Sequence, residues 1–391
     1  MVLIILWLIS VPLVAGELEI LIQKAFTNNK LIESYEYRKR AFLKKGKFYL
    51  SLPNPQLRFT LRNFDTEVPI ARKENPMSSY AFTFSQGYIL KEKRERKYSI
   101  YEGKAGEVEA RKEVFLRELK RDLSLFYYDF LLTLERERIL KEILEDIKLL
   151  KNITEEKYSY GKALLSDLLL LKAEIIKTER AIERERATRE ELLSRIYALT
   201  YERVPLKGEK LILRTFPKFF DPENSVYTNV LKKELDTIMK EYRYAKVVHK
   251  PDFNFLFDYA VRPDLPDMFS VGVAITVPIW YEKRERFLVL EAKERIEAKK
   301  REIEDIKVKL REEFEGLKRE YNLLKDTLDK IRREIEVKKA EIGSLFIAYK
   351  YDRVDIREIL RAYRILWKLK LDEVSLITYM NKLVVKAEAL L

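Results

Sequence analysis

Apolar residues recur at helical spacing along most of this chain, but residues 251–286 contain two runs in which apolar and polar positions alternate. Aromatic side chains occupy every second position of residues 253–259, and bulky apolar side chains do so in residues 269–277. Successive side chains of a strand point to opposite faces of its sheet, so each run predicts a strand. A segment rich in proline and aspartate separates the runs. The pattern predicts a β-hairpin with one apolar face and one face of polar or small residues.

The same pattern occurs earlier in the chain. Residues 56–62 and 79–86 alternate in the same way, and a loop that contains Pro69 and Pro76 joins them. The basic cluster Lys93-Arg94-Glu95-Arg96 reappears 190 residues later at 283–286. Self-similarity at a fixed offset indicates a tandem duplication. Each repeat is predicted to contain a helix, two strands, a very long helix, a turn and a returning helix.

The two long helices determine how the chain must assemble. At 1.5 Å per residue, each is predicted to span roughly 80 to 95 Å, so each must pack on other helices. An apolar stripe with three- and four-residue steps follows the second one, with one extra four-residue step from Leu310 to Phe314. This spacing is typical of a coiled coil with a stutter. An ordinary two-stranded coiled coil fits the stripe equally well.

The predicted division of the chain follows from these features. It consists of a signal peptide (1–16), a first repeat (17–200, with strands at about 56–62 and 79–86 and a long helix at about 91–150), a linker (201–223) and a second repeat (224–391, with strands at about 253–261 and 269–277 and a long helix at about 282–345).

Residues 2–16 form an apolar run that ends in the small residues Ala15 and Gly16. The run is too short for a comfortable membrane helix and is typical of a secretory signal peptide. It lacks a charged start, so a membrane anchor or a buried terminal helix is the alternative. No later segment approaches about 18 uninterrupted apolar residues. If the mature protein enters a bilayer, it must therefore do so as strands.

Composition narrows the function further. The net charge is +13, but Lys and Arg alternate with Glu and Asp nearly everywhere, as on a solvated helix surface, so we expect no nucleic-acid partner. The chain has no cysteine and a single histidine, His249. These residues cannot build a Ser/His/Asp or Cys/His set or a thiolate metal site. We expect no enzyme activity, no cofactor and no metal site.

Four strands with one apolar and one polar face suit a transmembrane β-barrel, but four strands cannot close one, since the smallest have about eight. Three copies would supply about 12 strands, continued by a barrel of long helices. The fold class is therefore mainly α with a membrane β-barrel portion, and the expected partners are two further copies and membrane lipid. Residues on the polar strand faces are candidates for the lumen: Arg58, Thr60, Arg62, Asn254, Asp258, Ser270 and Thr276. The alternative is a coiled-coil structural or adaptor-type envelope protein, anchored by its N-terminus, whose hairpins form a soluble domain.

Several local sequences, in order, resemble those of a known family. They are Pro53-Asn54-Pro55 and Pro251-Asp252 before strands, Ser270-Val271-Gly272-Val273 leading into Val277-Pro278-Ile279-Trp280, and a tyrosine-glycine turn followed by aspartate and a leucine run. With the internal repeat, they resemble the TolC family of outer-membrane efflux channels. Their residues are most similar to those of its heavy-metal exporter branch. The resemblance implies a trimeric exit duct with its barrel in the outer membrane and its helices in the periplasm. It also implies a periplasmic adaptor and an inner-membrane pump as partners.

The resemblance also implies a gate at the turns that end the long helices. In the family, tyrosine, aspartate and arginine side chains hold this gate shut. Asp167 and Tyr349 match the gate aspartate and tyrosine, Arg353 lies one place from the arginine position, and Glu358 and Arg361 fall on the acidic ring of the aperture. The arginine at 361 reverses one of those charges. Asp167 also fits a plain helix-start residue, and Tyr349 fits a plain packing residue at a turn.

Overall fold

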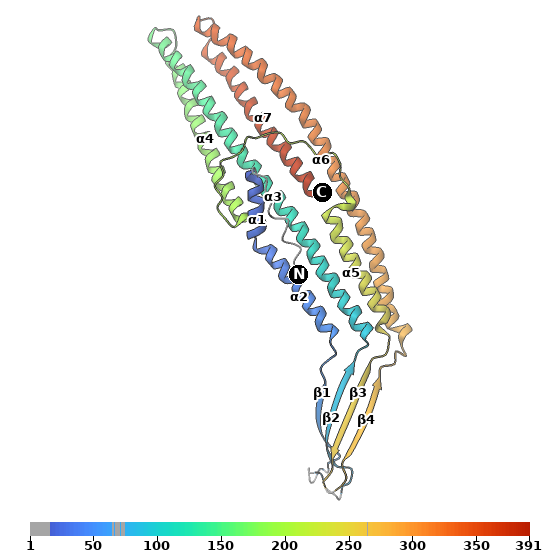
Figure 1. Cartoon of the computed structure of the whole chain (residues 1–391). Helices are drawn as coiled ribbons and strands as arrows, with labels where there is room; N and C mark the ends of the chain where they lie inside the picture. Colours follow the sequence, from blue (N-terminus) through green and yellow to red (C-terminus); the bar gives the residue numbers. More distant parts are fainter. Residues whose placement is uncertain (1–15, 65, 67–70, 72–74, 264) are drawn as a thin grey trace. The chain divides into compact units, whose positions relative to one another are not determined.

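The computed structural model describes residues 16–64, 66, 71, 75–263 and 265–391. The predicted signal peptide, except for Gly16, and Pro69 of the first hairpin loop lie outside these residues. The elements, in chain order, are α1 (Glu17–Asn28), α2 (Lys30–Leu50), β1 (Gln56–Arg62), β2 (Ser79–Tyr88), α3 (Lys91–Ser159), α4 (Leu165–Thr200), α5 (Val226–Val248), β3 (Phe253–Val261), β4 (Met268–Ile275), α6 (Glu285–Lys350) and α7 (Ile356–Leu390), with short 3-10 turns at Pro222–Asn224 and Tyr281–Lys283 (Figure 1).

All four strands belong to one antiparallel sheet in the order β1-β2-β3-β4 (Figure 1). The predicted hairpins are present, as β1 pairs with β2 and β3 pairs with β4. In addition, β2 pairs with β3 over the length of both strands, from Tyr80 opposite Val261 to Tyr88 opposite Phe253. This pairing joins the two sequence repeats in one sheet. The strands β1 and β4 are its free edges.

The helix α3 continues nine residues past its expected end near residue 150. Asn152 and Thr154 suggested a break there, but the Thr154 hydroxyl donates to the carbonyl of Leu150 (2.7 Å) inside the helix. This bond satisfies the side chain without competing for the helical backbone. The helix α6 likewise extends to Lys350 rather than ending near 345, and it begins at Glu285 because a 3-10 turn occupies the preceding residues.

The two turns after the long helices have the same backbone form. Gly161 (φ 72°) and Asp352 (φ 57°) both adopt the left-handed conformation. The amide of the next residue donates five residues back in each turn, from Lys162 to Lys157 (2.8 Å) and from Arg353 to Ala348 (2.9 Å). This is the bond pattern of a Schellman helix end. The internal repeat seen in the sequence therefore extends to the hydrogen bonds of the turns.

The compact units of the structure differ from the sequence repeats. One unit combines residues up to 32 with 113–226 and 307–391, and the other combines 33–112 with 227–306. Each unit thus draws on both repeats. The first contains the helix turns and several apolar cores, one of which includes Ile147, Leu171 and Ile359 near the turns. The second contains the sheet, and here the β2–β3 ladder is one of the links between the repeats.

The linker between the repeats has no helix or strand from Glu202 to Asp221, yet side chains of its own unit fix its backbone. The buried amide of Asn381 accepts from the backbone N–H of Arg214 (2.8 Å) and donates to the carbonyl of Ile212 (2.8 Å). The Tyr321 hydroxyl donates to the carbonyl of Arg214 (2.6 Å). At the other end, Glu17 accepts from the amides at 207 and 208. The linker is therefore a strap across α1, α6 and α7.

Among the helices that the structure describes, none is both apolar enough and long enough to serve as a membrane span.

Candidate functional site

One face of the sheet is apolar across all four strands. The register places Leu57, Phe84, Phe257 and Val271 in one row, and Phe59, Phe82, Tyr259 and Phe269 in the next. Neighbours in such rows share a face because cross-strand partners point the same way. These side chains are not covered: Leu57 is 76% exposed, Phe269 71% and Val271 72%. Apolar patches of this extent mark a surface that meets another apolar medium.

The opposite face carries a network of polar contacts. The Arg62 guanidinium donates to both oxygens of Asp258 (2.6 and 2.7 Å), and the Thr83 hydroxyl donates to the same carboxylate (2.6 Å). The Ser85 hydroxyl donates to Asn254 (3.0 Å). Bidentate arginine–carboxylate pairs are among the stronger polar interactions, and they fix both side chains. Thr83 and Ser85 were not selected from the sequence, although their alternation in β2 places them on this face.

The other predicted lumen residues lie around this network. Arg58 shares a row with Thr83, Asp258 and Ser270. Thr60 lies one row further along β1, opposite Ala81. Thr276 follows the end of β4, where its backbone N–H donates to the carbonyl of Asp252 (3.0 Å). The two faces of the sheet therefore differ sharply in polarity.

At the helix turns, Tyr349 joins α6 to α3. Its hydroxyl is 2.9 Å from the hydroxyl of buried Thr154. The ammonium of Lys157 lies 4.1 Å from the centre of the Tyr349 ring and donates to the Tyr349 carbonyl. Burial raises the pKa of the Tyr349 hydroxyl above its ordinary value, so this group stays neutral and can donate. Tyr349 thus bonds to Thr154 rather than to Asp167.

Two lysines of the first turn hold the second turn. Lys157 and Lys162 both form ion pairs with Asp352, the latter at 2.8 Å. Hydrogen bonds from Lys157 and then Lys162 lower the pKa of the Asp352 carboxyl to about 2. The Asp352 carboxylate therefore remains charged down to strongly acidic pH. Its ion pairs with Lys157 and Lys162, which connect the two turns, persist over the same range.

Asp167 has two partners. Its carboxylate accepts from the backbone N–H of Leu164 at the start of α4 (3.2 Å) and pairs with Arg357 of α7 (3.4 Å). Asp167 and Tyr349 line the same cleft of about 300 Å³ between the turns. Arg353, Glu358 and Arg361 are exposed. The structure thus brings two of the five predicted gate residues to one cleft.

A second ion pair between α4 and α7 lies seven residues further along both helices. The guanidinium of Arg364 donates to both oxygens of Glu174 (3.1 and 3.2 Å), and Glu174 is only 7% exposed. Burial alone would raise the pKa of this carboxyl, but Arg364 and Lys177 outweigh it and hold the pKa below its ordinary value. Glu174 is therefore a buried charge that depends on Arg364.

Three of these ion pairs join residues 190 positions apart: Lys162 with Asp352, Asp167 with Arg357, and Glu174 with Arg364. This separation equals the offset of the internal repeat to within one residue. Nearly equivalent positions of the two repeats therefore contact each other. Opposite charges at the repeat offset were the sequence signal that could have identified Arg357 and Arg364.

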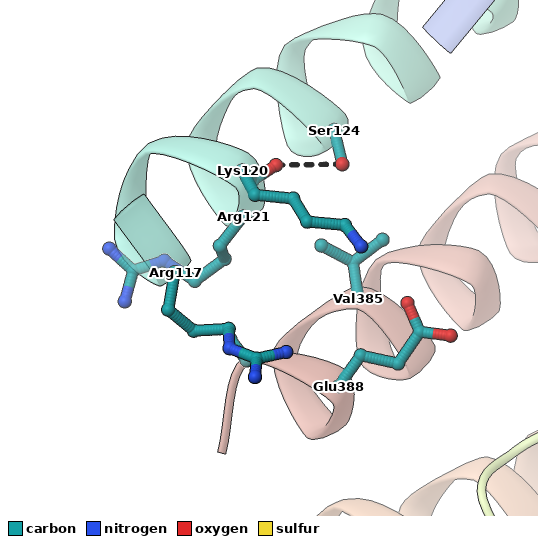
Figure 2. Close-up of a pocket in the computed structure, with 7 residues that line it drawn as sticks. Arg117, Lys120, Arg121, Ser124, Val385 and Glu388 are labelled. Atoms are coloured by element: carbon teal, nitrogen blue, oxygen red, sulfur yellow. Dashed lines mark hydrogen bonds between the residues drawn. The ribbon is translucent and has the colours of Figure 1, made fainter. Parts of the chain in front are cut away.

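One cavity of the helical part is too small for a ligand. Figure 2 shows this cavity, between α3 and α7, where Arg117 and Lys120 extend toward Val385 and Glu388 and Arg121 points away from them. Its volume is about 20 Å³, room for about one water molecule. Within the described ranges, no group of three His, Cys, Asp or Glu side chains could hold a metal ion.

Comparison with known proteins gives the fold. No protein-family model matches the sequence, and no curated protein matches it. Solved structures do match. CusC, described for its transmembrane channel formation, is 13% identical, with 97% of this chain and 95% of that chain covered and a TM-score of 0.78. This chain has the fold of an outer-membrane channel protein.

Two further structures agree. The outer-membrane channel OprN is 17% identical over 95% of this chain and 89% of that chain, with a TM-score of 0.78. The outer membrane protein VceC from Vibrio cholerae is 12% identical over 95% of this chain and 96% of that chain, with a TM-score of 0.73. The mainly helical fold with its four strands, predicted from the sequence, is therefore confirmed. Identities this low carry over the fold alone.

Proposed function

We propose that three copies of this chain form an exit duct in the outer membrane, through which solutes pass passively to the exterior. The sheet carries this proposal. Its apolar face is exposed on every strand, whereas its polar face carries a hydrogen-bonded network around Asp258. A barrel whose outer face meets lipid and whose inner face meets water requires this division.

The edges of the sheet support assembly from several copies. β1 and β4 each pair on one side only, so their outer backbone groups lack strand partners within the chain. Unpaired edges are not tolerated in hydrocarbon. Joining β4 of one copy to β1 of the next satisfies both edges. Three copies complete a closed barrel of about 12 strands.

The helix turns are proposed as the gate of this duct. The ion pairs between α4 and α7 and the contact of Tyr349 with Thr154 hold the turns together within one copy. Outward movement of one helix pair would have to break them. A periplasmic adaptor and an inner-membrane pump, implied by the family resemblance, are proposed as the partners that deliver solutes to this end.

The competing function is a structural or adaptor-type coiled-coil protein of the envelope. That protein would have to cover the apolar face of the sheet in water, and the described residues leave it open. The decisive experiment is expression in a diderm bacterium followed by fractionation. We expect heat-resistant trimers in the outer-membrane fraction. A monomer or dimer that stays dissolved without detergent would overturn the proposal.

A further inference from the structure

The charges on the polar face of the sheet do not balance. The four strands contain three charged residues in total: Arg58 and Arg62 in β1, and Asp258 in β3. Each copy therefore contributes one net positive charge to this face. If the duct forms as proposed, this face lines the lumen, and the inference rests on that proposed function.

The single carboxylate is already occupied. Both oxygens of Asp258 accept from Arg62, and Thr83 donates to one of them. Arg58 shares the row of Asp258 but lies on β1, two strands away, at a spacing of about 4.8 Å per strand. Its side chain is exposed, and it forms no ion pair or hydrogen bond within the described part of the chain. Arg58 is thus the charge that stays uncompensated.

Assembly does not supply a counter-charge from the strands. β1 is a free edge, so the strand that closes the barrel against it is β4 of the next copy. β4, Met268–Ile275, contains no charged residue, and its positions on this face are Met268, Ser270, Gly272 and Ala274. No register of that pairing places a carboxylate of β4 beside Arg58. Three equivalent Arg58 side chains then share one level of the lumen.

We propose that the barrel section of the pore prefers anions over cations and that Arg58 determines this preference. Rings of arginine or lysine select anions in pores, because a water-filled channel with a low-dielectric wall concentrates ions of opposite charge. The favoured solutes are accordingly small anions and anionic organic molecules. The preference must weaken as salt rises, since screening shortens from about 10 Å at 0.1 M to about 3 Å at 1 M.

The test uses purified full-length trimers in planar bilayers across a potassium chloride gradient at low salt. The reversal potential gives the ratio of chloride to potassium permeability. We expect this ratio to be about 3. Arg58→Gln should bring the ratio close to one, and Arg58→Glu should bring it below one. Arg58→Lys keeps the charge and should leave the ratio unchanged.

The matched control removes the other charges of the strands together. Arg62→Gln combined with Asp258→Asn keeps the net charge of the face and leaves Arg58 in place, so the ratio should stay above one. If the wild-type channel conducts but does not prefer chloride, or if Arg58→Glu leaves the ratio unchanged in heat-resistant trimers, the inference is wrong and the duct still stands. If folded trimers stay non-conducting even when Asp167→Ala with Tyr349→Phe removes the contacts of the proposed gate, the proposed duct itself is wrong, and this inference is overturned with it.

Discussion

The sheet and the helix turns both contain arginine–carboxylate ion pairs, but the surroundings of these pairs differ. In the sheet, a single ion pair links the repeats, and the apolar face is left for an environment outside the chain. At the turns, ion pairs and a buried hydroxyl contact connect the two helix pairs within one chain. In the proposed duct, a sheet held by lipid and by other copies is hard to open and close, whereas polar contacts within one copy can break and re-form. We therefore propose that the sheet is the permanent part of the duct and that the turns are the part that moves.

The largest effect is expected from a charge placed on the apolar face. Val271→Lys would put an ammonium against lipid, where lysine near the bilayer midplane costs about 2 to 4 kcal/mol per copy. Val271 is 72% exposed in the single chain, so folding in water does not require it. We expect the variant to lose heat-resistant trimers from the outer-membrane fraction. The neighbouring Ser270→Lys, on the polar face, should retain them, and equal yields of the two variants would contradict the assignment of the faces.

The next effect concerns the buried pair of the helix turns. Arg364→Met leaves the carboxylate of Glu174 buried without its main partner. We expect this change to destabilise the folded chain by about 2 kcal/mol, less than for a fully buried pair, because Arg364 itself is half-exposed. Thermal unfolding of purified trimers measures this loss. Adding Glu174→Met should restore most of it, because no buried charge is then left. A double variant no more stable than Arg364→Met would show that the pair contributes through packing instead.

A smaller effect on stability but a clear one on conduction is expected at the proposed gate. Asp167→Ala with Tyr349→Phe removes the partner of Arg357 and the hydroxyl that meets Thr154. Thr154 keeps its bond to Leu150, so the stability cost of the tyrosine change should be only about 1 kcal/mol. Single-channel conductance should rise. Tyr351→Phe, at a tyrosine that is 73% exposed, serves as the control, and a conductance no higher than that of this control would remove the gate assignment.

The smallest effect is a shift in acid sensitivity. Because the pKa of Asp352 is lowered to about 2, its ion pairs contribute in full above pH 4. As pH falls from about 4 toward 2, the carboxyl becomes protonated and this contribution is lost. Asp352→Asn, which tolerates the same left-handed backbone, should lower the melting temperature at pH 6 and reduce its further decline between pH 4 and 2. Parallel curves for the two proteins would show that these ion pairs add no stability.

Much of the fold could be read from local patterns. The strands lie within about two residues of their expected ranges because a period of two is visible in a few residues. The helix ends were less accurate. Asn152 and Thr154 have weak helical preference, but Thr154 is buried against Tyr349, and this tertiary contact overrides local preference. At the two sites, the sequence indicates Asp258 and Asp167 as candidates. It does not indicate which arginine each one meets, because these partners lie 196 and 190 residues away in the chain.

The sequence by itself determined the elements, their duplication, the two faces of each strand and the surplus of positive charge. These properties depend on neighbours within a few residues, or on a count. Only the tertiary structure decided that β2 pairs with β3, that Arg62 rather than Arg58 neutralises Asp258, and that Arg357 and Arg364 meet the carboxylates of α4. Each of these contacts joins segments from different repeats. Periodicity shows which way a side chain faces, but not which distant side chain it will meet.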